Sequence, residues 1–251
     1  MQKYRSEFFH FKRGVRIIKK CFSKIIKCYG TDKNKVSDII SKTTYDKSLT
    51  RLTISYKDFC SVIKISSRSI DDINNIEEYL LGSEISKNIF ALDSAKEVAV
   101  SLLKEKGLTL SLAESCTGGM CASELVSVSG ASEVFFGCVV SYDTSVKENI
   151  LSVSKSCIER YGVVSAECAA KMSEGARCSV KTDIAMSVTG ISGPGGALEN
   201  KPVGTVYIGI SDSSGTDVYR ANFKDMGRDK NRKNTVSLML HILIKRLIES
   251  C

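Results

Sequence analysis

The sequence predicts an α/β protein: a three-layer α/β/α domain around a mixed, mainly parallel sheet, preceded by a small α/β appendage. Two observations lead to this fold class. Strand-like and helix-like patterns alternate along the second part of the chain, as is typical of a parallel sheet with crossover helices. Of the 18 glycines, 15 lie from Gly107 onward, so tight turns are concentrated there as well. We therefore divide the chain into residues 1–92 and 93–251.

Basic charge is concentrated at the N-terminus. Residues 1–50 hold 13 Lys and Arg against 4 Asp and Glu, an excess of +9, so the formal net charge of +8 leaves about −1 for the rest. We therefore do not expect nucleic acid as a partner of the main domain. From Phe8 to Tyr29 apolar residues recur at steps of three and four between basic ones, which predicts a basic amphipathic helix. Such a helix can bind an anionic membrane, touch nucleic acid, act as a targeting segment or keep its lysines in solvent.

The rest of the appendage predicts two short strands over residues 51–66 and a helix over 70–82. The main domain then opens with a capping box, Ser94 and Glu97, at the start of a helix that Gly107 is placed to end.

Residues 108–119 predict a strand, a tight turn and the start of a helix, because leucines alternate with small residues and then give way to polar residues and a glycine pair. We expect this strand to be half-buried. The continuous apolar run at 134–142 is typical of a strand buried on both faces. The remaining elements are expected as a helix at 165–180, a strand at 183–190, a hairpin formed by 203–211 and 218–223, and a closing helix at 228–250.

Polar or glycine-rich sequence follows three of these strands, at 114–119, 142–147 and 189–196. Parallel neighbouring strands end at the same edge of a sheet, so we expect the three loops to surround one pocket for a small ligand. Glu114 can bind a ligand or cap the following helix, and the last loop can hold an oxyanion or be a structural turn. The candidate binding residues are Glu114, Thr117, Gly118, Gly119, Thr189, Gly190, Gly193 and Gly195.

Acyl transfer in this pocket would use Ser115 as nucleophile. A Ser-His-Asp arrangement is nearly excluded, because the two histidines, His10 and His241, lie in predicted helices far from these loops in the sequence. Lys147 is the candidate base if it is buried and neutral, and the alternative is a solvated lysine in the first turn of a helix. Tyr142 can pass a proton or hold the lysine. The neighbouring thiol, Cys116, is expected to be buried.

The ten cysteines contain no C-x-x-C pair, and the two histidines are far apart in the sequence, so we expect neither a metal nor a cofactor. Scattered thiols without a secretory leader pattern are typical of a reducing, cytoplasmic location. No apolar run is long enough to predict an integral membrane protein.

Four sequence blocks together closely resemble the CinA C-terminal-domain family over about residues 94–250. These blocks are AESCTGG at 113–119, VSY at 140–142 with Lys147 five residues after the tyrosine, VTGISGPGG at 188–196, and KPVGTV at 201–206.

The resemblance implies nicotinamide-nucleotide amidase activity, in which nicotinamide mononucleotide is hydrolysed to nicotinate mononucleotide and ammonia in pyridine nucleotide salvage. It implies a three-layer α/β domain that forms a homo-oligomer and needs no metal. Ser115, Tyr142 and Lys147 match the serine, tyrosine and lysine of the family. Arg228 and Arg232 match two arginines that are candidates for binding the substrate phosphate or another subunit.

The sequence departs from the family at Thr144, where asparagine is frequent, and at 226–228, where the family has Gly-Asp-Arg. Family members often carry a large N-terminal domain, which residues 51–92 resemble only faintly. The alternative function is a nucleotide-binding module without catalysis, in which the glycine-rich loops hold phosphate and the basic N-terminal helix recruits a membrane or nucleic acid.

Overall fold

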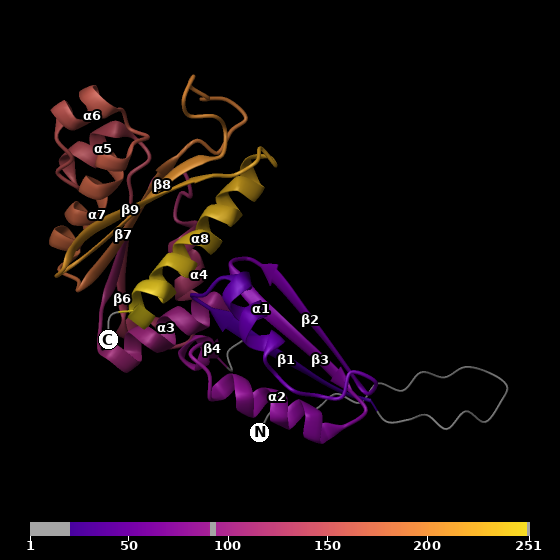
Figure 1. Cartoon of the computed structure of the whole chain (residues 1–251). Helices are drawn as coiled ribbons and strands as arrows, with labels where there is room; N and C mark the ends of the chain where they lie inside the picture. Colours follow the sequence, from indigo (N-terminus) through magenta and orange to yellow (C-terminus); the bar gives the residue numbers. More distant parts are fainter. Residues whose placement is uncertain (1–20, 91–93, 250–251) are drawn as a thin grey trace. The chain divides into compact units, whose positions relative to one another are not determined.

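The computed structural model describes residues 21–90 and 94–249. The chain divides into two compact units, one formed mainly by residues before Ser94 (unit 1) and one spanning Ser94–Leu247 (unit 2) (Figure 1). Within the described ranges, no helix combines the length and the apolar character needed to cross a bilayer.

Unit 1 is a four-stranded antiparallel sheet in the order β2-β3-β1-β4, with two helices. Its core is rich in isoleucine, including Ile63 and Ile65 from the sheet and Ile73 and Ile76 from a helix. The elements are β1 (Phe22–Tyr29), α1 (Lys33–Ser41), β2 (Thr50–Lys57), β3 (Cys60–Ser67), α2 (Ile70–Leu81), a short 3-10 turn (Ser86–Asn88) and β4 (Ile89–Phe90).

The predicted helix over 8–29 is wrong in its last part, because Phe22–Tyr29 is strand β1; residues 8–20 lie outside the described ranges. Strand β1 pairs with β3 along its whole length and buries Ile26 and Cys28 in the core. Helical spacing and strand alternation coexist in this short segment, and the long-range pairing decides between them. The predicted strands over 51–66 and the helix over 70–82 are confirmed as β2, β3 and α2.

Unit 2 is built on a five-stranded mixed sheet in the order β6-β5-β7-β8-β9. Strands β6, β5 and β7 are parallel, while β8 and β9 form an antiparallel hairpin beside β7. The predicted α/β fold with a mixed sheet is thus confirmed. The strands are β5 (Leu110–Glu114), β6 (Phe135–Val140), β7 (Ile184–Gly190), β8 (Thr205–Asp212) and β9 (Gly215–Asn222).

Helices cover both faces of this sheet (Figure 1). Helices α5, α6 and α7 lie on one side, and α7 packs across β5, β7, β8 and β9; helices α3, α4 and α8 lie on the other side. The helices are α3 (Ala95–Lys106), α4 (Met120–Val126), α5 (Thr144–Asn149), α6 (Lys155–Tyr161), α7 (Ala166–Val180) and α8 (Arg228–Glu249), with a 3-10 turn at Ala131–Glu133. The predicted capping box at Ser94 is present, and Gly107 ends α3 in the left-handed conformation.

Two predictions about strand burial are wrong. All five residues of β5 are buried, because β5 lies between β6 and β7 with helices on both sides. Strand β6, expected to be buried on both faces, is an edge strand in which the side chains of Phe136 and Val140 are exposed. Hydrophobicity within a strand does not reveal its place in the sheet, which depends on the order of strands.

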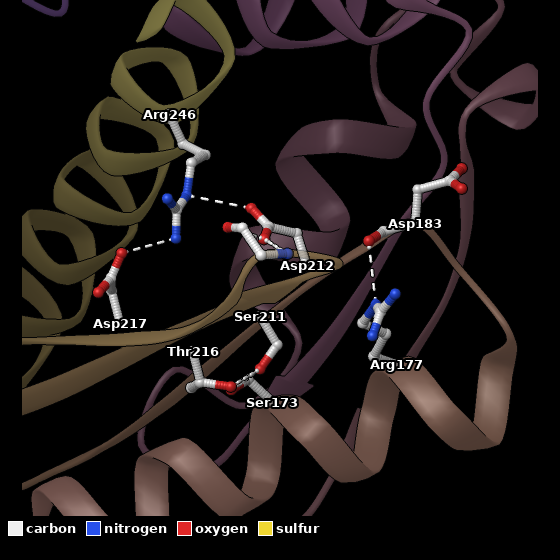
Figure 2. Close-up of polar contacts among 9 residues, drawn as sticks. Ser173, Arg177, Asp183, Ser211, Asp212, Thr216, Asp217 and Arg246 are labelled. Carbon is white, nitrogen blue, oxygen red and sulfur yellow. Dashed lines mark hydrogen bonds and ion pairs between the residues drawn. The ribbon is translucent and has the colours of Figure 1, made fainter. Parts of the chain in front are cut away.

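The sheet edge opposite the carboxyl ends of the parallel strands is held by paired polar groups (Figure 2). Arg246, near the end of α8, forms ion pairs with Asp212 of β8 at 3.2 Å and with Asp217 of β9 at 2.6 Å. Arg177 of α7 donates to the carbonyl of Asp183 at 3.1 Å. Hydroxyl groups also pair across α7, β8 and β9, through the contacts Ser173–Ser211 (3.0 Å) and Ser211–Thr216 (2.7 Å). Polar side chains thus fasten α8 and α7 to the hairpin.

Candidate active site

Ser115 directly follows β5, at the edge where the parallel strands end. Its N–H donates to the carbonyl of Val188 in β7 at 3.0 Å, and its own carbonyl accepts from Gly118 at 3.1 Å, which closes a tight turn. Gly118 and Gly119 have φ values of +60° and +89°, a region that disfavours side chains. The glycine pair therefore allows the chain to reverse immediately after Ser115 and enter α4.

Glu114 caps the N-terminus of helix α4. Its carboxylate is fully buried and accepts hydrogen bonds from the backbone N–H groups of Gly119 (2.8 Å), Cys121 (3.3 Å) and Ala122 (2.8 Å). The Cys138 thiol also donates to it at 3.7 Å. A carboxylate at a helix N-terminus is favoured by the free N–H groups there. Of the two roles that the sequence left open, Glu114 has the capping role.

Lys147 lies on α5 with only 2% of its surface exposed. Its Nζ lies 3.2 Å from Ser115 Oγ and donates to the carbonyls of Ser141 at 2.5 Å and Tyr142 at 3.4 Å, so that a neutral amine can direct its lone pair to the hydroxyl. Asp143 begins α5 as its N-cap by accepting from the backbone of Ser145. This short capped helix turns Lys147 inward, and the burial excludes the alternative of a solvated lysine.

The environment of Lys147 favours a neutral amine. Burial lowers its pKa below the ordinary value of 10.5, against smaller opposing contributions that include the charge of Asp143. No carboxylate in the described residues forms an ion pair with Nζ; its partners are a hydroxyl and two carbonyl oxygens. A neutral amine beside a hydroxyl is the arrangement that a serine nucleophile with a lysine base requires.

The Tyr142 side chain does not bridge Ser115 and Lys147. Its hydroxyl accepts a hydrogen bond from Arg228 at 3.1 Å, and 63% of the residue is exposed. Arg228, at the start of α8, also donates to the carbonyl of Gly193 at 3.0 Å. Tyr142 therefore holds Lys147 through its backbone carbonyl, and its phenol lies with Arg228 instead of between Ser115 and Lys147.

A cavity of about 140 Å³ opens beside Ser115 and Lys147. The predicted convergence of three loops is confirmed, since the segments after β5, β6 and β7 all contribute to the lining, together with α5, the segment between α6 and α7, and α8. The lining residues are Ser115, Cys116, Tyr142, Thr144, Lys147, Val163, Val164, Thr189, Gly190, Ser192 and Arg228.

Several predicted binding residues lie outside this lining: Glu114, Thr117, Gly118, Gly119, Gly193 and Gly195. The carbonyl of Thr117 accepts from Arg232 of α8 at 2.7 Å. Thr189 does line the cavity, but its hydroxyl donates to the carbonyl of Val163 at 2.7 Å and so fixes a neighbouring lining residue.

Sequence reasoning missed Ser192 and Asn231. Ser192 lines the cavity and is only 5% exposed, and in the described residues its hydroxyl has no hydrogen-bond partner other than the neighbouring thiol of Cys116. Asn231 of α8 donates to the carbonyl of Ser192 at 3.1 Å. The helical spacing of Arg228, Asn231 and Arg232, three and four residues apart, places them on one face of α8. This spacing could have identified Asn231 from the sequence as a residue on the same face of the helix as the two arginines.

Cys116 lines the cavity beside the serine, but burial raises the pKa of its thiol to about 11. The thiol is therefore protonated at neutral pH and is a weak nucleophile. The described residues contain no group of three or more His, Cys, Asp or Glu side chains placed to hold a metal ion.

Comparisons with known proteins agree with this architecture. The model of the family described as the CinA C-terminal domain matches residues 92–247. A CinA-like protein of Pseudothermotoga lettingae is 45% identical over 175 residues, which are 66% of this chain and 43% of that protein. A crystal structure of the competence/damage inducible protein CihA from Agrobacterium tumefaciens is 34% identical, with a TM-score of 0.58, over 62% of this chain and 98% of that one.

A second crystal structure, that of the competence damage-inducible protein A from Klebsiella pneumoniae, is 28% identical with a TM-score of 0.60 and covers 62% of this chain and 99% of that one. The chain spans about half the length of the curated relatives that it matches. With a family model matching well over half of its residues, the chain belongs to the CinA C-terminal domain family.

Proposed function

We propose that this protein is an amidohydrolase that converts nicotinamide mononucleotide to nicotinate mononucleotide and ammonia with Ser115 and Lys147 as its catalytic pair. The observation that carries the proposal is the 3.2 Å contact between Lys147 Nζ and Ser115 Oγ inside the cavity. The depressed pKa of the buried amine supports its role as a base. Membership of the CinA C-terminal domain family supports the choice of substrate.

In the first half of the reaction, Ser115 Oγ attacks the carboxamide carbon while its proton passes to Lys147 Nζ. A bond forms between Oγ and carbon, and the carboxamide oxygen becomes an oxyanion. When the oxyanion collapses, the carbon–nitrogen bond breaks and the protonated lysine returns the proton to the leaving nitrogen. Ammonia departs, the nicotinoyl group remains as an ester on Ser115, and the lysine is neutral again.

In the second half, a water molecule takes the place of ammonia. Lys147 Nζ removes a proton from this water as its oxygen attacks the ester carbon. Collapse of the second tetrahedral intermediate breaks the bond to Oγ, and the proton returns to Ser115. The products are nicotinate mononucleotide and an unchanged enzyme, so one water is consumed for each ammonia released.

The substrate phosphate is proposed to lie beside Arg228. This side chain lines the cavity and already contacts two lining segments through its guanidinium group. A guanidinium group has five N–H donors, which leaves donors for a phosphate. Arg232 in the next turn of α8 is paired with Asp229 at 3.7 Å and donates to the Thr117 carbonyl, which leaves Arg228 as the arginine of the lining.

The direct test is an ammonia assay of the full chain with nicotinamide mononucleotide in the presence of EDTA. We expect ammonia and nicotinate mononucleotide in equal amounts, and a loss of at least about 1,000-fold in kcat for Ser115→Ala. Ser156→Ala, which removes an exposed hydroxyl on α6, is the matched control and should keep full activity. Full activity of Ser115→Ala contradicts the mechanism. Saturable binding without ammonia from the unaltered chain favours the alternative, a nucleotide-binding module.

A further inference from the structure

The lining of the cavity contains one aromatic ring, that of Tyr142, and no carboxylate. Arg228 is a positively charged lining residue, and burial lowers the pKa of the other basic lining residue, Lys147, below its ordinary value. No residue in the described lining carries a carboxylate that could pair with a cationic ligand group. Tyr142 is the aromatic lining residue, and its ring can attract a cation through the negative charge density above its faces.

Tyr142 is fixed at both ends although 63% of it is exposed. Its backbone carbonyl accepts from Lys147 at 3.4 Å, and its hydroxyl accepts from Arg228 at 3.1 Å. Arg228 contacts the hydroxyl, which lies in the plane of the ring at its edge. Cations lie over tyrosine rings at Tyr161 and Tyr207, and no such contact to the Tyr142 ring is present among the described residues.

We infer that the Tyr142 ring is a stacking platform for a cationic aromatic ring, and that it makes the pocket selective for the oxidised, positively charged pyridinium of the substrate over neutral ring forms. This inference rests on the proposed function and names the recognition element of the same site. It assigns Tyr142 to substrate binding through its ring and removes its hydroxyl from the proton transfer.

The surroundings suit a cationic ring. A protonated lysine at the cavity wall would repel a pyridinium, whereas a neutral amine does not, so the state that makes Lys147 a base also admits the cation. Apolar side chains of Val163 and Val164 complete the wall, and a planar ring can pack against them without leaving polar groups unpaired. Arg228, held at the hydroxyl, stays beside the proposed phosphate position and away from the ring face.

The test measures separately what the ring and the hydroxyl of Tyr142 contribute to binding. It also distinguishes the effect of the charge of the ligand from that of its shape. Binding is measured by calorimetry on the full chain carrying Ser115→Ala, so that no ligand is consumed. The two ligands are nicotinamide mononucleotide, whose ring is a cation, and its reduced form, which has the same phosphate and carboxamide on a neutral ring. Tyr142→Leu removes the ring, Tyr142→Phe removes only the hydroxyl, and Tyr219→Leu on β9 is the control for loss of an exposed tyrosine elsewhere.

We expect Tyr142→Leu to weaken binding of the oxidised nucleotide about 5- to 30-fold and that of the reduced nucleotide less than about 3-fold. Tyr219→Leu should leave both affinities within about 3-fold. Tyr142→Phe releases Arg228 from the hydroxyl, so any loss of affinity should be the same for the two ligands, which carry the same phosphate. Equal losses for the two ligands in Tyr142→Leu would overturn the inference, because the ring would then recognise shape and not charge. A loss in Tyr142→Phe that is confined to the oxidised nucleotide would also overturn it, because the hydroxyl would then be the group that selects the cation.

The same measurements distinguish this inference from the proposed function. If the unaltered chain releases ammonia but Tyr142→Leu weakens binding of the two nucleotides equally, the proposed function is supported and the proposed role of the ring is wrong. If the chain neither binds the nucleotide nor releases ammonia from it, both fall together.

Discussion

The two edges of the unit 2 sheet differ in how their buried polar side chains are paired. At the edge shown in Figure 2, Arg246, Asp212 and Asp217 satisfy one another through ion pairs. At the edge with the cavity, a lysine is buried without an ionic partner in the described residues, and the Ser192 hydroxyl has no partner there other than the Cys116 thiol.

This difference fits a division in which one edge stabilises the fold and the other carries the proposed active site. Buried polar groups that are paired with one another favour a single conformation of the chain. A buried polar group without a partner lowers the free energy of unfolding unless a ligand supplies the missing hydrogen bond. Helix α8 reaches both edges, with Arg228 contacting the cavity loops and Arg246 contacting the hairpin. Substitutions at the two edges should therefore change different properties, and the four predictions below run from the largest effect to the smallest.

Lys147→Ala should lower kcat about 100- to 10,000-fold, the usual range for loss of a general base. Because the pKa of Lys147 is lowered from 10.5 by burial, the activity of the unaltered protein should rise with pH and reach its plateau below pH 10.5. The rise reflects deprotonation of the amine and should be absent in the variant. The measurement is a pH profile of kcat/KM.

A small primary amine such as methylamine should partly restore activity to Lys147→Ala, since it can occupy the space that the side chain leaves. Lys147→Met fills that space and is the matched control, which the amine should not restore. Equal restoration of both variants would show that the amine acts from solution and would weaken the assignment of the base.

Glu114→Ala should destabilise the fold by about 2–4 kcal/mol, because three N–H groups at the start of α4 lose their buried acceptor. Activity should fall as well, since the turn that holds Ser115 is tied to this cap. Thermal unfolding and the ammonia assay test both effects. A raised KM with unchanged thermal stability would instead assign Glu114 to substrate binding.

Arg246→Met should destabilise the fold by about 1–3 kcal/mol, because Asp212, with 14% of its side chain exposed, loses its ionic partner. Activity at 25 °C should be unchanged. Burial tends to raise the pKa of Asp212, but hydrogen bonds from Ser214 and the charge of Arg246 lower it below 3.8. The Asp212 contribution to stability is therefore complete above pH 3.8 and is lost as pH falls through the lowered pKa.

The unaltered protein and Arg246→Met should thus approach one another in thermal stability in strong acid. Arg160→Met removes an exposed arginine that lies over the ring of Tyr161 and is the control, for which a change below about 0.5 kcal/mol is expected. A large loss of activity in Arg246→Met would show that the two edges are not separable.

Ser192→Ala should lower kcat/KM about 3- to 10-fold, the effect of one neutral hydrogen bond to the substrate. The thermal stability should stay nearly equal or rise, because the hydroxyl that is removed has no oxygen or nitrogen partner in the described residues and contacts only the thiol of Cys116. A lower unfolding temperature with unchanged kinetics would identify Ser192 as a structural residue.

The sequence allowed the loops around the cavity to be predicted because local chemistry marks them. Glycines at 118–119 and 190–196 and the polar residues after each strand are visible without a structure, and parallel pairing of β5 with β6 and β7 brings them together. The scarcity of histidine pointed to a lysine base, and the structure places Lys147 within hydrogen-bonding distance of Ser115.

Long-range packing explains what could not be predicted. The exposed edge position of β6 follows from strand order, which no window of residues reveals. Phe22–Tyr29 forms a strand because β3 and β4 pair with it on both sides. The direction of the Tyr142 side chain depends on Arg228, which is 86 residues further along the chain.

The two catalytic side chains proposed here form no pair of opposite charges, because Lys147 is held by carbonyl oxygens and a hydroxyl. Dissolved salt weakens attractions between ions and has little effect on a neutral amine shielded from solvent. Added electrolyte should therefore raise KM by screening the phosphate from Arg228, while the turnover rate at saturation stays nearly constant. Ionic strength becomes a means of separating capture of the nucleotide from the chemical step.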